Sequence, residues 1–352
     1  MNLFTHTLLN WYATHKRQLP WRDITDPYRI WISEVILQQT RVAQGYDYFV
    51  RFVRRFPDIR TLAAATEEEV LKAWQGLGYY SRARHLHQAA RSTNGTFPTT
   101  YAGVRALKGV GDYTAAAICS LAYGMPYAVV DGNVYRVLAR YFGVDAPIDT
   151  PTGKKLFAAL ADEMLDPAHP ADYNQAIMDF GALQCTPASP DCTACPLAET
   201  CAARIAGTVD NLPVKQHKTR VTNRYFNYLI IRAGAYIYIH RRTAQDIWQR
   251  LFELPLIETD APPSEESLRD HPQLQAWFTP AERATLRSVR LGVKHVLTHR
   301  RLFANLYAIT PSPASRPFAD DPDYLCIPTT ELDRYAFPRL IQSFLSLPDI
   351  KQ

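Results

Sequence analysis

Along the first part of the chain, apolar residues recur at helical spacing, whereas beyond residue 222 they alternate with polar residues. Helical spacing is clearest in Met1–Trp21 and in Pro27–Thr40, where Asp26 is placed to cap the helix. Residues three and four apart lie on one face of a helix, while alternate residues lie on one face of a strand. The pattern therefore predicts a mainly α N-terminal part followed by an α+β part.

Two short helices are predicted on either side of a Gly-Val-Gly turn. Ala102–Leu107 forms the first helix, which stops at Gly109 and Gly111. Thr114–Tyr123 forms the second helix, which ends at the normal stop signal Gly124. The glycines of the turn let main-chain N–H groups approach a phosphate closely, so this helix-hairpin-helix can hold nucleic-acid backbone. An ordinary helix–helix connection is the alternative.

A linker and a sheet are predicted in the last third of the chain. The linker is residues 207–222, which contain Pro213 and the basic residues Lys215, Lys218 and Arg220. The segments that alternate as strands do are Tyr225–Arg232 and Ala235–His240, joined at Gly234, and Arg287–Leu297 and Leu302–Thr310. The expected domains are therefore residues 1–206 and residues 223–352, on either side of the linker.

Composition and charge add limits to this picture. A chain of 352 residues with 47% hydrophobic and 21% charged residues is typical of a globular protein with two or three domains. No apolar run spans a bilayer, and Met1–Trp21 lacks a secretory signal, so a cytoplasmic location without membrane contact is expected. Residues 1–110 carry fifteen Lys and Arg against eight Asp and Glu, and residues 141–201 carry two against nine. The basic N-terminal part is consistent with a surface that binds the DNA backbone. A solvent-exposed surface without a binding role would show the same charge pattern.

Four of the six cysteines fall within seventeen residues, at Cys185, Cys192, Cys195 and Cys201. At this density, cysteines of a cytoplasmic chain bind metal rather than form disulfides. A zinc ion and a 4Fe–4S cluster both suit four thiolates. The spacing does not separate a structural role from electron transfer, and we favour a cluster that anchors the domain. Cys119 and Cys326 stand apart and are expected to be core residues.

Glu34 is a carboxylate among large apolar side chains on its predicted helix. Desolvation in such a place raises the pKa of a carboxyl group, which makes Glu34 a candidate general acid near neutral pH. A buried ion pair with Arg22 or Arg29 is the alternative.

Asp131 precedes a predicted helix at 134–140. Either Asp131 caps this helix, or Asn133 caps it and leaves Asp131 free; in both cases the helix dipole favours ionised Asp131. A charged carboxylate beside a sugar stabilises an oxocarbenium-like transition state. A neutral Glu34 and a charged Asp131 would together suit cleavage of a glycosidic bond.

The chain resembles adenine DNA glycosylases of the MutY type, within the helix-hairpin-helix superfamily that includes endonuclease III. The matching stretches are Leu19–Arg22, Trp31–Thr40, Gly76–Tyr80, Leu107–Gly111, Val130–Val134 and the four cysteines. The resemblance implies a six-helix subdomain at about 22–126 and an iron–sulfur subdomain at about 1–21 and 127–206 with one 4Fe–4S cluster. It also implies a monomer, associated with the nucleoid if the chain is bacterial.

The implied activity is removal of adenine mispaired with 8-oxoguanine or guanine in double-stranded DNA, with the adenine flipped into a pocket between the two helical subdomains. Glu34 would protonate adenine at N7, and Asp131, oriented by Asn133, would stabilise the sugar cation. The residues that would contact DNA are Arg22 in the adenine pocket, Gln39, Leu77 and Tyr79 near the 8-oxoguanine, and Lys108, Gly109 and Gly111 in the hairpin.

Tyr113 stands where bifunctional members of the superfamily carry a lysine that forms a Schiff base with the sugar. A phenol cannot form that imine, so the resemblance implies excision of the base without strand cleavage. Two other functions fit the same motifs: a glycosylase for another mispair, such as thymine opposite guanine, and a non-catalytic iron–sulfur DNA-binding or redox protein.

The C-terminal part resembles the Nudix-like domain found at this place in the family. Residues 256–290 lack the Arg-Glu and Glu-Glu signature of Nudix hydrolases, so nucleotide hydrolysis is not expected. The family reads 8-oxoguanine with a Phe-Ser-His loop, and the nearest match here is Leu297-Thr298-His299, in which Leu replaces the aromatic residue. The alternative is that His299 and His295 satisfy hydrogen bonds in a strand turn.

Overall fold

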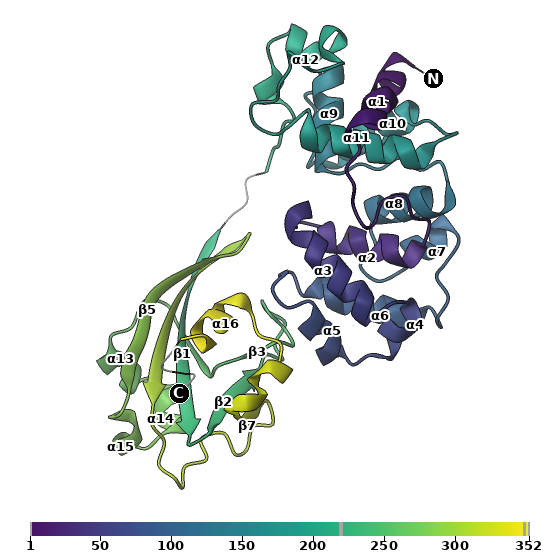
Figure 1. Cartoon of the computed structure of the whole chain (residues 1–352). Helices are drawn as coiled ribbons and strands as arrows, with labels where there is room; N and C mark the ends of the chain where they lie inside the picture. The colour runs from purple at the N-terminus through teal and green to yellow at the C-terminus, as the bar shows by residue number, and fades with distance from the viewer. Residues whose placement is uncertain (1, 218–220, 348–349, 351–352) are drawn as a thin grey trace. The chain divides into compact units, whose positions relative to one another are not determined.

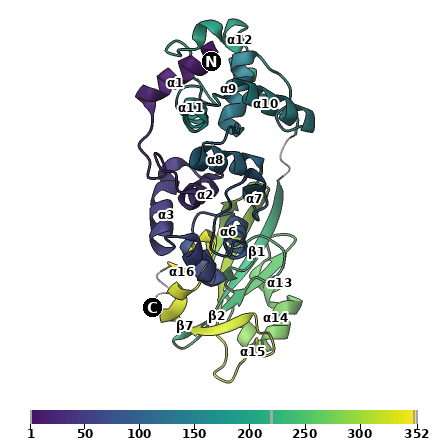
Figure 2. The same cartoon turned by 90° about the vertical axis from the view of Figure 1, so that its right-hand side faces the viewer.

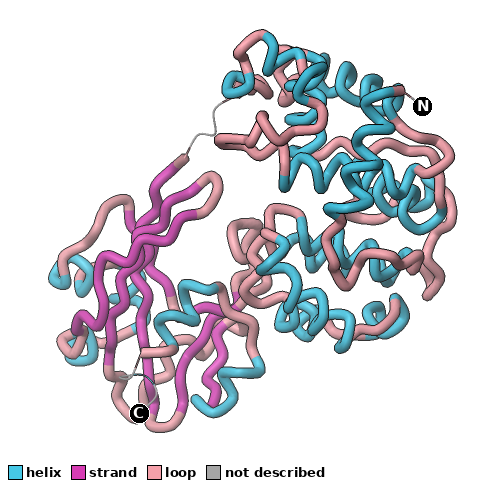
Figure 3. The backbone as a smooth tube through the Cα atoms, turned by 45° about the horizontal axis from the view of Figure 1, so that its top comes forward, coloured by secondary structure: helices cyan, strands magenta, loops and turns pink. Residues whose placement is uncertain are grey.

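The computed structural model describes residues 2–217, 221–347 and 350, so Lys218 and Arg220 of the expected linker lie outside the described residues. Contacts divide the chain into two compact units, which are Met1–Ala65 with His85–Lys218, and Thr66–Arg84 with Thr219–Gln352 (Figure 1). The first unit is helical and the second contains the sheet, as the prediction of an α part followed by an α+β part requires (Figure 3). No helix within the described residues is long and apolar enough to cross a membrane.

The first unit consists of helices joined by short loops. They are α1 (Leu3–His15), α2 (Pro27–Leu37), α3 (Val42–Arg55), α4 (Ile59–Ala64), most of α6 (Ser81–Ser92), α7 (Tyr101–Arg105), α8 (Asp112–Tyr123), α9 (Gly132–Phe142), α10 (Pro151–Met164), α11 (Pro170–Leu183) and α12 (Ala202–Ile205), with the 3-10 turns η1 (Ala198–Thr200) and η2 (Val209–Asn211). The core between α1, α9, α10 and α11 buries Leu8, Val137, Phe157 and Phe180. Figures 1 and 2 both place α2 and α8 side by side.

The predicted capping and hairpin signals are confirmed. Oδ1 of Asp26 accepts a hydrogen bond of 2.9 Å from the Tyr28 N–H and so caps α2. Gly124 ends α8 in the left-handed conformation, with φ at 64°. Gly109 has φ at 80°, and a Cβ added there would lie 2.7 Å from Cβ of His85. Both its backbone conformation and the lack of room therefore require glycine at the hairpin turn.

Much of the expected linker is tied to the first unit. The Ile148 N–H donates to the Val214 carbonyl at 3.0 Å. The carboxylate of Asp149 accepts hydrogen bonds from the N–H groups of Gln216 and His217, at 2.9 and 2.8 Å. The chain is therefore anchored up to His217.

The second unit is built around a seven-stranded sheet of order β3-β2-β1-β6-β5, in which β4 pairs with β1 and β7 with β2. Its elements are α5 (Glu67–Ala73), β1 (Thr222–Ala233), β2 (Tyr236–Arg241), β3 (Phe252–Glu253), β4 (Leu256–Thr259), α13 (Glu265–Arg269), α14 (Pro272–Trp277), α15 (Pro280–Arg283), β5 (Arg287–Val296), β6 (Arg300–Ile309), β7 (Tyr324–Pro328), η3 (Thr329–Arg334) and α16 (Arg339–Leu345). The four predicted strands correspond to β1, β2, β5 and β6. The short strands β3, β4 and β7 were not predicted.

The sheet is covered on both faces. Phe226 and Tyr228 of β1 belong to a core shared with Phe344 of α16. Leu229, which points to the opposite face, belongs to a second core with Leu274 of α14. Burial on both faces explains why β1 is a nearly continuous apolar run. β1 and β6 are parallel, and the register pairs Thr222 with Arg300.

Candidate active site

A pocket of about 630 Å³ lies within the first unit. Its walls come from the segment before α2, from α2 itself, and from α8, α9 and α11. The predicted site residues that line it are Arg22, Glu34, Gln39, Tyr113, Asp131 and Asn133. Five separate stretches of sequence, within 17–22, 33–42, 113–121, 130–135 and 175–182, are therefore brought together around one cavity.

Glu34 is 7% exposed on α2, and burial raises the pKa of its carboxyl group. The Tyr113 hydroxyl donates a hydrogen bond of 2.7 Å to its Oε2. The alternative of a direct ion pair is wrong for the described residues: Arg22 binds Asp179 at 2.7 Å, and Arg29 faces Asp26 at 3.4 Å. Glu34 thus lies in a desolvated site with a hydroxyl donor and without a direct cationic partner.

Asp131, not Asn133, is the N-cap of α9. Its Oδ1 accepts hydrogen bonds from the N–H groups of Asn133 and Val134, both at 2.8 Å. Its Oδ2 accepts one from Nδ2 of Asn133, also at 2.8 Å. Burial raises the pKa of Asp131, against the expectation from the helix dipole alone, while the three donors and the charge of Arg136 oppose that rise. Asp131 therefore differs from Glu34 in its donors, which are three N–H groups instead of one hydroxyl, and in its exposure, because Asp131 is only half-buried.

Arg136 connects this acid to the cysteine-rich loop, and sequence reasoning missed it. Its Nη2 donates to Oδ1 of Asn133 at 2.9 Å, and its Nε donates to the Cys185 carbonyl at 2.7 Å. It also donates to the carbonyls of Gly132 and Gly181. The available signal was a charged residue on the buried face of α9, because a buried charge needs such partners.

The four clustered cysteines lie in residues 185–201, after α11. Burial raises the pKa of Cys195, and the negative charges of the other three cysteines contribute to the rise, to about 11, which places all four within electrostatic range. Nη1 of Arg140 lies 3.5 Å from Sγ of Cys185. Among the described residues, no three His, Cys, Asp or Glu side chains are grouped so as to hold a single metal ion. Four neighbouring thiols beside an arginine are nevertheless the donor set that suits an iron–sulfur cluster.

The two isolated cysteines differ from each other. Cys119 is fully buried, as expected of a small core residue. Cys326 is exposed, so its expected core position is wrong. It lies on β7, which was not predicted as a strand, and outward positions of a strand are not identifiable before the strand is known.

The hairpin presents an accessible backbone. Lys108 is exposed, and a Cβ added at Gly111 would meet nothing within 4 Å. Gly111 has φ at −94°, so its conformation does not require glycine, and the open space there leaves the start of α8 accessible to a ligand. Nε of Arg105 donates to Oδ1 of Asp112 at 2.6 Å and braces the turn.

Three other predicted DNA contacts lie in turns. Gln39, in the first unit, has φ at 58°, and Tyr79, in the second, has φ at 45°. A left-handed conformation costs a non-glycine residue about 1–3 kcal/mol and is concentrated at functional sites. Leu77 is 7% exposed, whereas Tyr79 is exposed and its hydroxyl is hydrogen-bonded to Oγ1 of Thr298.

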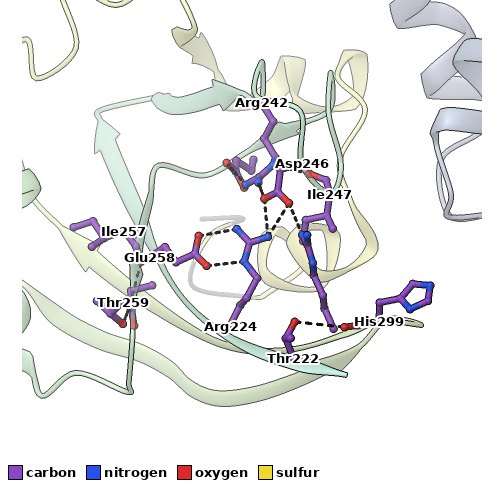
Figure 4. Close-up of polar contacts among 12 residues, drawn as sticks. Thr222, Arg224, Arg242, Asp246, Ile247, Ile257, Glu258, Thr259 and His299 are labelled. Carbon is purple, nitrogen blue, oxygen red and sulfur yellow. Dashed lines mark hydrogen bonds and ion pairs between the residues drawn. The ribbon is translucent and has the colours of Figure 1, made fainter. Parts of the chain in front are cut away.

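The predicted lesion-reading residues Thr298 and His299 lie in the turn between β5 and β6. The Leu297 N–H donates to the Arg300 carbonyl at 2.8 Å, which closes the turn, and the Thr222 N–H donates to the His299 carbonyl at 3.1 Å. In Figure 4 the His299 ring points away from the neighbouring ion-pair cluster. Backbone hydrogen bonds therefore close the turn. The alternative, in which the His299 ring supplies a hydrogen bond for the turn, is not needed.

An ion-pair cluster lies at the base of this turn (Figure 4). Asp246 accepts from Nη1 of Arg224 at 2.9 and 2.6 Å, from Nη2 of Arg242 at 2.9 Å, and from Nη1 of Arg300. Burial raises the pKa of Asp246, but the hydrogen bonds from Arg300, Arg224 and the Ile247 N–H lower it to about 2. Asp246 therefore stays ionised and fixes the first residue of β6.

Two family models match the chain. Residues 32–162 match the HhH-GPD superfamily of base excision DNA repair proteins, and residues 227–347 match the NUDIX domain. The chain is 36% identical over 260 residues to the adenine DNA glycosylase of Buchnera aphidicola subsp. Baizongia pistaciae (strain Bp), covering 72% of this chain and 73% of that protein. It is 44% identical over 214 residues to the adenine DNA glycosylase of Mus musculus, covering 57% and 41%.

Solved structures resemble the helical unit. A thermostable thymine-DNA glycosylase has a TM-score of 0.54 at 30% identity and covers 58% of this chain and 96% of its own. A non-covalent endonuclease III–DNA complex has a TM-score of 0.50 at 21% identity and covers 58% and 94%. At 21% identity, the similarity to endonuclease III shows a shared fold and carries no conclusion about activity. Both agree with the predicted helix-hairpin-helix fold.

Proposed function

The chain belongs to the adenine DNA glycosylase family, and we propose that it removes adenine mispaired with 8-oxoguanine or guanine from double-stranded DNA. One observation carries the proposal: two carboxyl groups, buried Glu34 and half-buried Asp131, line the same pocket and are held by different donors. A neutral acid and an ionised carboxylate on one cavity are what hydrolysis of an N-glycosidic bond requires.

In the proposed reaction, protonated Glu34 is the general acid. Its raised pKa keeps the proton available near neutral pH, and it transfers that proton to N7 of the flipped adenine. The C–N bond then breaks, and its electron pair leaves with the base. Tyr113 holds Oε2 of Glu34 in place while the proton moves.

Asp131 then stabilises the cation that remains on the sugar. Its three N–H donors, two from Asn133 and one from Val134, hold both oxygens and favour the ionised form. A fixed negative charge needs no reorganisation when the cation forms. Water adds to the sugar, the proton that it releases returns to the Glu34 carboxylate, and an abasic site remains.

Strand cleavage is not part of the proposed reaction. The second residue of α8 is Tyr113, and its phenol cannot form a Schiff base with the sugar. Alkali should therefore be needed to break the product strand. Prompt nicking and borohydride trapping of a protein–DNA adduct would contradict this part of the proposal.

The loop of Cys185, Cys192, Cys195 and Cys201 would hold a 4Fe–4S cluster. When bound, such a cluster would cross-link the loop and so stabilise it through four thiolate ligands. Arg136 ties the Cys185 carbonyl to Asn133, so order in the loop supports the position of Asp131. The hairpin backbone at Gly109 and Gly111 would bind a DNA phosphate.

Thymine opposite guanine is the second candidate substrate, because a thymine-DNA glycosylase matches the helical unit at 30% identity. Duplexes that carry 8-oxoguanine:adenine, guanine:adenine and guanine:thymine pairs would separate the two under single-turnover conditions. The proposal predicts adenine release from the first two duplexes. Release of thymine alone would contradict it.

Glu34→Gln tests the role of the acid. It keeps the size of the side chain but cannot donate an acidic proton, so excision should fall by about 10²–10⁴-fold. Glu163→Gln, at an exposed position of α10, is the matched control and should excise normally. Duplex binding by both variants should stay close to that of the parent protein. Full activity of Glu34→Gln would remove Glu34 from the mechanism.

A further inference from the structure

Arg22 lies close to Glu34, yet it is bound to another carboxylate. Both residues line the pocket, and the charge of Arg22 acts on the Glu34 carboxyl group. Nη2 of Arg22 nevertheless donates to Oδ1 of Asp179 on α11, at 2.7 Å. Nη1 of Arg22 lies 3.3 Å from the Tyr12 hydroxyl, which in turn donates to Oε1 of Gln175 at 2.7 Å. The guanidinium group is thus held on two sides, away from a direct bond with Glu34.

Asp179 is built into the interior as a fixed acceptor. Its side chain is 0% exposed, while that of Arg22 is 7% exposed. Oδ1 also accepts hydrogen bonds from Nε of Arg17 at 3.1 Å and from Nη2 of the same residue. Two arginines therefore share one buried carboxylate. Such a carboxylate needs cationic partners, because an unpaired buried charge is strongly destabilising.

A direct bond from Arg22 to Glu34 would oppose the proposed reaction. An opposite charge within about 4–6 Å lowers the pKa of a carboxyl group by about 1–3 units. Glu34 would then be ionised at neutral pH and would have no proton to give to the base. The other groups that face Glu34 are Tyr113 on α8, whose hydroxyl donates to it, and Asp131 at the start of α9, whose charge favours the protonated form.

We propose that Asp179 is a positioning residue, which binds Arg22 and so leaves Glu34 protonated and able to act as the general acid. This inference rests on the proposed function. Asp179 does not need to touch substrate; it acts through Arg22. The arrangement also explains why a guanidinium group can line the adenine pocket without neutralising the acid next to it.

The pH dependence of single-turnover excision tests the proposal, with the full-length protein and an 8-oxoguanine:adenine duplex. Because the protonated form of Glu34 is active, the rate falls as the pH rises through its pKa. In Asp179→Asn, Arg22 is released to pair with Glu34, so this fall should move to lower pH by about 1 unit or more. Asp179→Glu, which keeps the charge, should move it much less.

The double variant Asp179→Asn/Arg22→Met separates charge competition from general damage. In the double variant, the pH at which the rate falls should return to a higher value, because Arg22 is no longer present to pair with Glu34. This holds whatever the absolute rate. An unchanged profile in Asp179→Asn, or a shift that persists in the double variant, would overturn the proposal.

Arg22→Met alone decides the matter if Asp179→Asn does not fold. The proposal predicts a shift of less than about 0.5 units, because Arg22 is already bound elsewhere. A rise of more than one unit would mean that Arg22 is the true partner of Glu34 and would overturn the proposal. Failure of the proposed function is distinguishable, since the parent protein would then release no adenine at any pH.

Discussion

The Tyr113 hydroxyl donates a hydrogen bond of 2.7 Å to Oε2 of Glu34. Tyr113 is the second residue of α8 and follows directly after the hairpin that contains Gly109 and Gly111. Glu34 lies on α2, which runs beside α8. The turn proposed to hold DNA backbone and the residue that holds the general acid are therefore adjacent in the chain, so binding of backbone can order the acid.

Tyr113→Phe should raise the pH at which excision is lost. The hydrogen bond from Tyr113 lowers the pKa of Glu34, although burial raises it more. Removal of the hydroxyl therefore raises this pKa further, and the fall in rate should move to higher pH by up to about 1 unit. Single-turnover rates between pH 5 and 9 measure the shift, and a move to lower pH would contradict the assigned direction.

Glu34→Gln should stabilise the folded protein at alkaline pH while it abolishes excision. The pKa of Glu34 is raised above its ordinary value of 4.5, so the folded state holds this proton more tightly than the unfolded chain. The contribution of Glu34 to stability is fully present below that ordinary value and is lost as the pH rises through the folded-state pKa. The variant should unfold at a higher temperature than the parent at pH 8. A smaller difference in unfolding temperature between the variant and the parent is expected at pH 5. An equal difference at both pH values would show that protonation of Glu34 does not affect stability.

Asp131 has a structural role as a cap and a proposed catalytic role, and three substitutions separate them. Asn and Ser retain an N-cap acceptor, whereas Asp131→Ala loses it and should cost about 1 kcal/mol. All three remove the charge, so excision should fall at least about 10²-fold in each. Thermal unfolding and single-turnover excision measure the two effects. If the loss of excision were proportional to the loss of stability among the three variants, Asp131 would serve only as a helix cap.

Local features of the fold could be predicted from the sequence, while the contacts that set the chemistry could not. Asp26 as a cap and Gly124 as a helix end are decided by neighbouring residues, so the pattern revealed them. Arg22 and Asp179 lie 157 positions apart. Helical spacing predicts that Arg22 and Asp179 each lie on a helix or near one. It does not predict which residue of another helix each will contact. The alternative of an ion pair between Glu34 and an arginine failed for this reason.

The turn at Thr298 and His299 was recognised from its motif, but its support was not. Asp246 fixes Arg300 through a cluster that joins β1, the residue after β2, and β6. No local sequence pattern predicts that these three segments meet. Asp246 also lies between strands, where its spacing carries no periodic signal.

Asp246→Asn should weaken the preference for 8-oxoguanine over guanine opposite adenine. Loss of the charge removes one carboxylate partner from Arg224 and Arg242, which keep Glu258 and Glu253, and it removes the ion pair of Arg300, which anchors the end of the turn. Excision opposite 8-oxoguanine should fall about tenfold, equivalent to about 1.4 kcal/mol. Excision opposite guanine should change little, because the catalytic pocket belongs to the helical unit. Asp260→Asn, at an exposed position, is the matched control, and a preference retained in a folded Asp246→Asn would contradict the role.

This chain should remove adenine and leave the strand intact. The most direct measurement is a single-turnover reaction of the full-length protein with a duplex that carries one 8-oxoguanine:adenine pair, analysed with and without alkali. Free adenine is expected in both samples, and strand breaks are expected only after alkali. Either of two results would contradict this expectation. One is that no adenine is released, and the other is strand breaks without alkali together with a borohydride-trapped adduct.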